Sequence, residues 1–280
     1  MTGTSVLSGR AGRQRLVPSL RRRHLFEWGD APWLPSLLRR FMTDHLTFHA
    51  RRAFAPVVPL LAQSLRRTGT DRIVDLCSGG GGPLPALLPA IDAATGWRVR
   101  LTLTDLHPDR AALRQAGVRS DGDVDYRDAP VNALACPASL TGYRTLFTAL
   151  HHFRPDEVRR ILDDAAARRV ALAAFEIQER SPVSLLTLPL AMFVSSFVLT
   201  PFLPRCSAGR LFFTYVVPLA PLCFAWDTFV SCWRTYTPTE LGTLAASIGR
   251  DGYCWRTGST PARGYIGRYR ISWIIGEPLT

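Results

Sequence analysis

The sequence predicts a doubly wound α/β fold, in which helices cover both faces of a mostly parallel sheet of about seven strands. Three observations support this prediction. Short apolar runs alternate with helical patterns along the middle of the chain, a glycine-rich turn follows the first run, and an acidic residue follows each of the first three runs. The 280 residues, of which 47% are hydrophobic, are enough for one such domain with an insertion.

The expected elements follow one another in a regular order. Apolar residues recur at helical spacing after Pro32, so we expect two helical stretches within residues 31–67. The apolar run within residues 72–79 predicts a buried strand that meets a tight turn, because it ends in glycines. By the same reasoning we expect helices at residues 83–91, 109–116, 155–168 and 237–248, and strands at residues 97–104, 123–127, 144–148, 170–177, 253–257 and 269–275.

An apolar insertion at residues 181–236 interrupts this alternation. Residues 183–204 carry no charged side chain over a length that could cross a bilayer, and residues 211–226 are uncharged too. Five prolines in these two stretches argue against straight membrane spans. Two structures remain open: a re-entrant or interfacial helical hairpin at a membrane surface, and a soluble apolar lid that closes over a site.

The charge of the chain is strongly positive, with a formal net charge of +12, and all of its 34 Lys or Arg residues are arginine. This usage is typical of a GC-biased coding sequence, and the arginines are scattered along the chain, so we expect no nucleic-acid partner. Residues 1–26 form a basic arm without the apolar core of a signal peptide. We therefore expect a cytoplasmic protein that could lie peripherally at the inner face of the membrane, with lipid contacting the arm or the insertion.

The six cysteines form no C-x-x-C pair, and no histidine cluster stands beside them at ligand spacing. We expect free thiols, most of them buried, and no metal site.

The most specific signal is the run that begins at Asp75 and continues Leu-Cys-Ser-Gly-Gly-Gly-Gly. Gly79 and Gly81 allow the backbone to approach a ligand that lies across the end of a parallel sheet. Asp105 follows the second strand, where a carboxylate can accept both hydroxyls of a ribose. Asp128 follows the third strand, where it can accept a hydrogen bond from an adenine amino group.

These residues resemble the motifs of the class I S-adenosylmethionine (SAM)-dependent methyltransferases. The first motif of that family runs acid, apolar, Gly, x, Gly, x, Gly; Asp75, Gly79 and Gly81 fall on it, and Cys77 replaces the first glycine. The resemblance implies a Rossmann-like, seven-stranded sheet that ends in an antiparallel hairpin, with SAM as the cofactor. It implies cofactor contacts from Asp75, Gly79, Gly81, Asp105, Leu106, Asp128, Ala129 and Ala149.

On this resemblance the chain divides into four parts: a basic arm with a helical extension (residues 1–67), the SAM-binding core (68–180), the apolar insertion (181–236), and the final helix and hairpin of the core (237–280). A dinucleotide fingerprint fits less well, because Leu84 or Pro85 stands where its third glycine should be. A P-loop is excluded because the chain has no lysine.

The resemblance implies methyl transfer to an O, N or C nucleophile, and the apolar insertion predicts an apolar small-molecule or lipid-like acceptor. The oligomeric state stays open. Two other functions also remain: a non-catalytic, membrane-associated binding or assembly protein that keeps a degenerate SAM fold, and an RNA methyltransferase. The second lacks support, because no Asn-Pro-Pro-Tyr-type motif or catalytic cysteine follows the fourth strand.

The catalytic candidates are His151, His152, Asp227 and Tyr236. Either histidine could act as a general base or serve only to shape the loop after the fourth strand. Asp227, with Arg234, could orient an acceptor or decorate a surface face of its helix. Two further questions stay open: whether Glu176 lines the pocket or pairs with an arginine such as Arg180, and whether the segment with Glu27, Asp30 and Trp33 caps the SAM site or braces the sheet.

Overall fold

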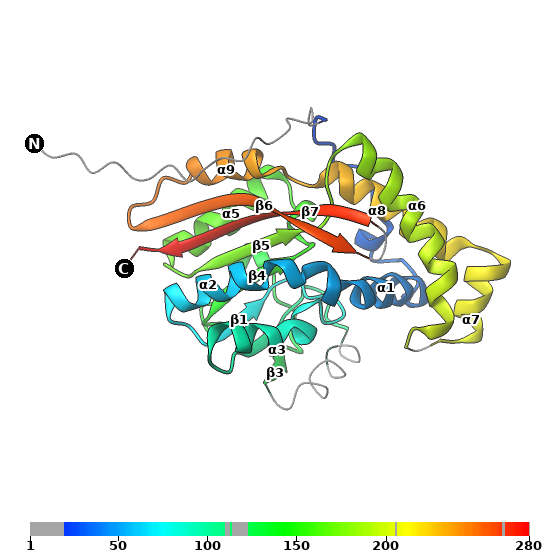
Figure 1. The fold of residues 1–280 in the computed structure, drawn as a ribbon, viewed down its shortest axis with the longest axis horizontal. Helices are drawn as coiled ribbons and strands as arrows, with labels where there is room; N and C mark the ends of the chain where they lie inside the picture. The colour runs from blue at the N-terminus through cyan, green and yellow to red at the C-terminus, as the bar shows by residue number, and fades with distance from the viewer. Residues whose placement is uncertain (1–19, 110–112, 114–122, 205, 265–266, 280) are drawn as a thin grey trace, which may run out of the picture.

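The computed structural model describes residues 20–109, 113, 123–204, 206–264 and 267–279. A seven-stranded sheet with the order β3-β2-β1-β4-β5-β7-β6 forms its centre (Figure 1). The first five strands are parallel, and β7 runs antiparallel to both β5 and β6, which confirms the expected sheet and its closing hairpin. The strands are β1 (Arg72–Asp75), β2 (Arg100–Leu103), β3 (Val124–Tyr126), β4 (Tyr143–Phe147), β5 (Leu172–Glu176), β6 (Tyr253–Gly264) and β7 (Gly267–Pro278).

Helices cover both faces of the sheet. Helices α2 (Val58–Thr68) and α3 (Leu84–Thr95) bury their apolar residues against one face, and α5 (Pro155–Ala167) and α9 (Pro238–Ala246) bury theirs against the other. This three-layer arrangement is the doubly wound fold expected from the alternating pattern. Both α5 and α9 begin with proline in their first turn and an acidic residue that accepts the N-cap amide, as their sequences predict.

A helical lobe, defined here as residues 182–234, extends beyond the sheet on the right of Figure 1. It contains α6 (Pro182–Leu199), the short α7 (Ala208–Leu211) and α8 (Leu219–Arg234). Residues of α8 pack with Leu38, Phe41 and neighbouring residues of α1 (Ser36–Phe54) in a separate apolar core. The insertion therefore folds against the N-terminal extension, and the two together stand at the carboxyl edge of the sheet.

The uncharged stretch at residues 211–226 is not a straight helix, in line with its prolines: a π-helical segment (Phe212–Val216) follows α7, and the chain then bends by 73° into α8, where Pro218 cannot donate to a preceding turn. Other elements differ from the expectation. Strand β6 runs past residue 257, because an edge strand tolerates the proline and glycines that made its sequence pattern irregular. Of the helix expected at residues 109–116, only residues 109 and 113 lie among those described.

Candidate functional site

The buried carboxyl group of Asp75, at the end of β1, holds the glycine-rich loop that follows through a hydrogen bond from Ser78. This side chain is 1% exposed, and its carboxylate accepts hydrogen bonds from the hydroxyls of Thr145 (2.6 Å) and Ser78 (2.7 Å). Burial raises the pKa of Asp75 to about 7, against the effect of these two hydrogen bonds. Asp75 therefore stabilises the loop through its hydrogen bonds. The sequence alone could not distinguish this supporting role from direct contact with a ligand.

The loop itself has the conformation that its sequence requires. Gly79 has a φ of 55° and Gly81 a φ of 118°, both in the region that glycine adopts without strain. A Cβ atom added at Gly79 would meet nothing within 4 Å, so the space above this turn is open. Cys77, at the position of the family's first glycine, takes a φ of 60° and keeps the turn at the cost of backbone strain.

Asp105 lies next to this turn, directly after β2. One carboxylate oxygen accepts from the amide of Gly79 (2.8 Å) and the other from the amide of His107 (2.8 Å). The amide of Val131 donates to the carbonyl of Asp105 (2.8 Å), which brings the loop with Asp128 to the same place. Leu106, Asp128 and Ala129 are exposed, and Ala149 is buried after β4.

These groups fit the adenosine half of SAM. A carboxylate oxygen has two lone pairs, so Asp105 retains acceptor capacity for ribose hydroxyls beside its two amide partners. The exposed Leu106 offers an apolar surface for a base, and the open turn at Gly79 leaves room for the backbone to approach. The structure thus places Gly79, Asp105 and the loop with Asp128 next to one another, with Asp75 buried under the turn, and their contact with a cofactor stays a prediction.

The second part of the site begins where β4 ends. Thr148 has a φ of 50°, and the chain then enters a short 3-10 turn, Leu150–His152. Glu176, at the end of the neighbouring β5, accepts from the amide of Leu150 (2.7 Å) and contacts Nδ1 of His151 at 2.7 Å. His151 and Glu176 are each 1% exposed, so this pair fixes the turn and directs Nε2 of His151 away from Glu176. Glu176 therefore does not pair with Arg180, which instead binds Glu240.

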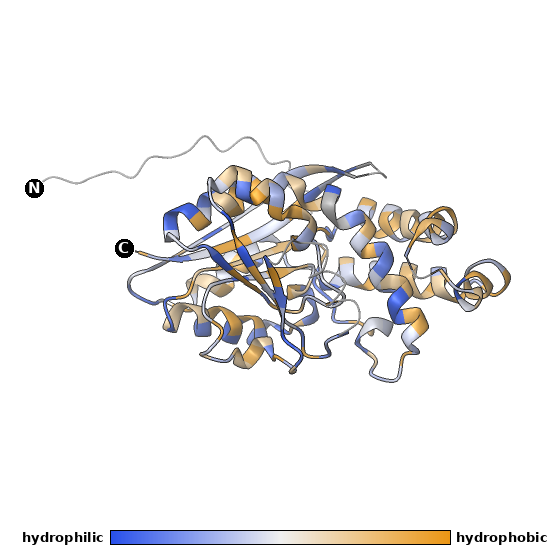
Figure 2. Ribbon diagram, turned by 90° about the horizontal axis from the view of Figure 1, so that it is seen from below, coloured by the Kyte–Doolittle hydropathy of each residue, from blue (hydrophilic) through white to orange (hydrophobic). Residues whose placement is uncertain are grey.

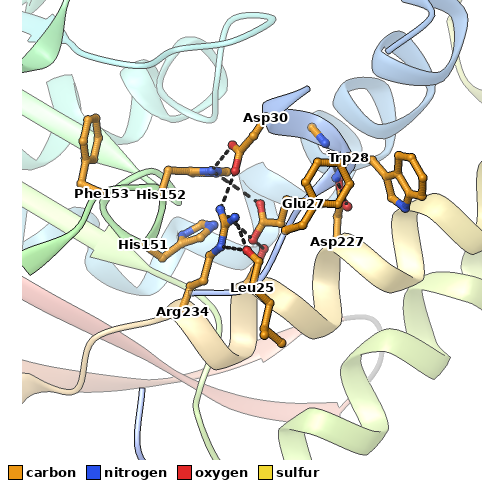
Figure 3. Close-up of polar contacts among 12 residues, drawn as sticks. Leu25, Glu27, Trp28, Asp30, His151, His152, Phe153, Asp227 and Arg234 are labelled. Atoms are coloured by element: carbon orange, nitrogen blue, oxygen red, sulfur yellow. Dashed lines mark hydrogen bonds and ion pairs between the residues drawn. The ribbon is translucent and has the colours of Figure 1, made fainter. Parts of the chain in front are cut away.

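A cluster of charged side chains surrounds His152 (Figure 3). We call Glu27, Asp30, His151, His152 and Arg234 the acid–base cluster. Nδ1 of His152 lies 2.8 Å from Asp30 Oδ1 and 3.5 Å from Glu27 Oε2. Nη1 of Arg234 donates to Asp30 Oδ2 at 2.6 Å and lies 3.6 Å from Glu27 Oε1. Residues from three distant parts of the chain thus meet at one point on the carboxyl edge of the sheet.

Two pKa shifts follow from these contacts. Burial lowers the pKa of His152, but the hydrogen bond to Asp30 and the negative charges of Glu27 and Asp30 outweigh it, so the pKa of His152 is raised above its ordinary value. Burial raises the pKa of Asp30, yet its hydrogen bonds with His152 and Arg234 hold this pKa well below the usual range. Asp30 therefore stays ionised and keeps the His152 ring oriented.

The segment that carries Glu27 and Asp30 is held against α8 by several hydrogen bonds. Both oxygens of Asp227 accept backbone amides, from Trp28 at 2.7 Å and Gly29 at 2.8 Å. Trp226 Nε1 donates to the carbonyl of Phe26 at 3.0 Å, and Arg234 Nε donates to that of Leu25 at 2.8 Å. Residues 25–30 thus pack on α8 and bring Glu27 and Asp30 to His152.

Asp227 and Tyr236, two of the catalytic candidates, are both engaged by neighbouring parts of the fold. Asp227 is 8% exposed and Arg234 is 2% exposed, so the surface interpretation of their helix face is wrong. Asp227 is occupied by the backbone of the N-terminal segment. Tyr236 is 2% exposed; its hydroxyl donates to the carbonyl of Phe153 at 2.8 Å, and the guanidinium of Arg22 lies over its ring at 4.1 Å. Both side chains thus hold parts of the fold beside the acid–base cluster, and a part in catalysis stays a prediction for each.

Three members of the acid–base cluster are also potential metal ligands. The ligand atoms of Glu27, His151 and His152 all lie within 4.8 Å of one another. Sequence spacing could not reveal this group, because more than a hundred residues separate Glu27 from the histidines. The guanidinium of Arg234 pairs with both Glu27 and Asp30, so hydrogen bonds and ion pairs already engage part of this group.

Comparison with known proteins identifies the fold. No family model matches the chain, and no curated protein matches its sequence. Among solved structures, the plantazolicin methyltransferase BamL, in complex with a triazolic desmethylPZN analog and SAH, has a TM-score of 0.53 and 10% identity over 89% of this chain and 92% of its own. The plantazolicin methyltransferase BpumL, with a monoazolic analog and SAH, has a TM-score of 0.52 and 10% identity over 90% and 92%. This similarity and the strand order show that the chain has the class I methyltransferase fold.

Proposed function

We propose that this protein is a SAM-dependent methyltransferase that acts on an O, N or C nucleophile of an apolar small-molecule or lipid-like acceptor. The observation that carries the proposal is the common position of two groups at the carboxyl edge of the sheet: the cofactor residues around Gly79 and Asp105, and the acid–base cluster around His152. The two plantazolicin methyltransferases, whose structures hold SAH and desmethylPZN analogs, support a small-molecule acceptor.

SAM, when bound, supplies a methyl group on a sulfonium with a good leaving group, so the protein has to align the acceptor and remove its proton. Asp105 is placed to hold the ribose, and the turn at Gly79 to approach the cofactor backbone. His152 has Nδ1 engaged by Asp30, which leaves Nε2 as the atom that takes the proton. With SAM bound, the methyl group would pass from its sulfonium to the nucleophile and leave SAH as the thioether. The part that this chain would supply is Nε2 of His152, which would take the proton from the acceptor O–H or N–H.

The cofactor is tested by calorimetric titration of the purified protein with SAM and SAH. We expect binding to wild type and a loss of affinity of about tenfold or more in Asp105→Ala, because the ribose hydroxyls lose a charged acceptor. Asp71→Ala is the matched control, since Asp71 lies at the amino end of β1 and pairs with Arg100 there. Well-folded wild type that binds neither SAM nor SAH would contradict the proposal.

Turnover is tested with methyl-labelled SAM and extracts of apolar metabolites and lipids. We expect labelled product with wild type, insensitivity to a chelator, and loss of product with His152→Ala at unchanged SAM affinity. SAM binding without transfer to any extract would support the non-catalytic alternative. Label that enters only RNA, with binding that weakens steeply as salt rises, would support the RNA methyltransferase.

A further inference from the structure

Helix α6 of the lobe buries small residues and exposes large apolar ones, the reverse of an ordinary surface helix. Helix α6 packs against α8 through small residues: Ser184, Ala191, Ser195 and Ser196 are all buried. Its opposite side exposes large apolar residues at intervals of three or four positions. These are Val183 (70% exposed), Leu186 (72%), Leu190 (58%), Val194 (52%) and Val198 (60%), followed by Phe202 (79%). A helix at a water-facing surface shows the reverse pattern, with its polar face outside.

The exposed apolar surface continues onto the next part of the lobe. The Phe197 ring lies between those of Phe193 (5.2 Å) and Tyr215 (6.0 Å), and the Tyr215 hydroxyl donates to the carbonyl of Phe197. Val216 is 68% exposed and Leu222 is 53% exposed. Figure 2 shows the helices of the lobe coloured mostly as hydrophobic. Exposed large apolar residues thus recur on α6, on the segment before α8 and at the start of α8, whereas an ordinary protein surface carries them singly.

This surface does not belong to a helix that crosses a bilayer completely. The base of α6 lies beside the end of α8, because Arg180 donates to the carbonyl of Thr235 (3.1 Å). Arg234 lies at that level of α8, and Asp227 lies two turns farther along the helix; both are bound into the acid–base cluster and its segment. Charged groups at this depth would be costly in hydrocarbon, although Pro182–Phe202 is by length and composition apolar enough to span a bilayer. The geometry fits a lobe that lies on a bilayer and inserts only into the interfacial headgroup region of one leaflet.

A cationic cavity stands at the base of the same helix. It has a volume of about 670 Å³ and is lined by Arg52, Arg263, Arg268 and Arg270, with Glu179 as its acidic member. Glu179 comes three residues before the first residue of α6, so the cavity adjoins the start of the exposed apolar stripe. An excess of guanidinium groups beside an apolar face is complementary to a bilayer that carries anionic headgroups.

We infer that the lobe docks on an anionic lipid bilayer, with the exposed side of α6 in the interfacial layer and lipid phosphates at the cationic cavity. This docking stands independently of the proposed methyl transfer. If that function holds, the docking means that the acceptor is a lipid or a lipid-dissolved molecule, because the lobe also carries Asp227 and Arg234 into the site. The occupant of the surface is thus a membrane, with a second copy of the chain as the outcome to be tested against it.

The test is flotation of the purified full chain with vesicles of phosphatidylcholine alone or mixed with phosphatidylglycerol. We expect binding to the mixed vesicles, reduced about tenfold or more in the triple variant Leu186→Ser, Leu190→Ser, Val194→Ser, which removes apolar area without touching the core. The double variant Trp97→Ser, Leu279→Ser is the matched control, since both residues are exposed and lie outside the lobe. Arg263→Gln with Arg268→Gln should abolish the preference for the anionic vesicles, whereas Arg98→Gln should not.

Two results would overturn this inference. One is equal recovery of wild type and the triple variant with mixed vesicles. The other is a stable dimer in the absence of lipid, measured by sedimentation, that the triple variant converts to monomer. Calorimetric titration with SAM on the same variants keeps the two proposals apart, because lost vesicle binding at unchanged SAM affinity concerns the lobe alone.

Discussion

Asp227 Oδ2 accepts a hydrogen bond from the amide of Gly29 at 2.8 Å, although the two residues lie 198 positions apart in the chain. This contact, together with the one from Trp28, holds the N-terminal segment over the carboxyl edge of the sheet. Glu27 and Asp30 flank the held residues, so the carboxylate of Asp227 helps to place the two acids of the acid–base cluster, together with the bonds from Trp226 and Arg234 (Figure 3).

Gly29→Ala should loosen this contact. An added Cβ would lie 3.2 Å from Asp227 Oδ2, so the amide and the carboxylate must move apart. We expect methyl transfer to fall several-fold while SAM affinity is unchanged, because the segment positions His152 and not the cofactor. Gly242→Ala on α9 is the matched control, with a comparable contact of 3.4 Å far from the cluster. Equal turnover in both variants would show that the segment has no role in the reaction.

The variant Asp227→Asn tests how much the contact between Asp227 and the amides of Trp28 and Gly29 contributes to stability. One amide partner would face an NH2 group in place of a carboxylate oxygen and would lose its acceptor. We expect the free energy of unfolding to fall by about 1–3 kcal/mol, since the group is nearly buried. Protease cleavage near residue 27 should also become faster in the variant. An unchanged cleavage rate would mean that other bonds, such as that from Trp226 to Phe26, hold the segment by themselves.

The pH dependence of turnover should report His152. Its pKa is raised above the ordinary value by Asp30 and Glu27, and the neutral ring is the base, so kcat/KM should fall as pH drops below that raised pKa. Asp30→Asn removes one negative charge and should move this acidic limb to lower pH. Asp163→Asn is the control, because Asp163 has similar exposure (44% against 40%) and a similar arginine partner, Arg250. An acidic limb that Asp30→Asn leaves in place would exclude His152 as its source.

Asp75 should make the fold less stable as pH rises. Its folded pKa of about 7 lies above the ordinary value of 3.8, so the carboxyl group stabilises the fold fully only below the unfolded pKa. This contribution is lost as pH rises through about 7 and is constant above. Relative to Asp75→Asn, wild type should lose on the order of 2–4 kcal/mol of unfolding free energy across that window. Denaturant titrations at several pH values measure it, and parallel curves for the two proteins would contradict the shift.

Cys77→Gly should stabilise the protein. Cys77 has a φ of 60°, a conformation that costs an ordinary residue about 1–2 kcal/mol and glycine nothing. Part of this gain is offset because glycine loses more backbone freedom on folding, so we expect a net increase of about 1 kcal/mol or less. Cys77→Ala keeps the Cβ and therefore the strain, and the difference between the two variants in urea unfolding isolates the backbone effect. A less stable glycine variant would show that the thiol's packing dominates.

The sequence sufficed for the fold because the fold depends on local patterns, and the cofactor contacts stay a prediction. Short apolar runs mark buried strands, and the ends of parallel strands share one edge, which is why Asp105 and the loop of Asp128 could be placed together without coordinates. The acid–base cluster was only partly predictable. Both histidines were candidates, but their partners Glu27 and Asp30 come from a segment whose position depends on tertiary hydrogen bonds.

Asp227 and Arg234 show most clearly what could not be predicted from the sequence. Two charges seven residues apart on a helix have the same pattern whether they face water or a buried partner. Only the backbone amides of Trp28 and Gly29, supplied from the other end of the chain, decide between these cases. No periodicity in the sequence records such a partner.

The position of β7 in the sheet affects how the chain folds while it is being translated. This strand lies between β5 and β6 and follows the lobe in the chain, so β5 has a neighbour on only one side while the ribosome is still making residues 182–266. The apolar surface of α6 therefore emerges before the sheet can close. If the lobe docks on a bilayer as inferred above, docking before the sheet is complete would shield both the apolar helix and the open edge of β5 from aggregation.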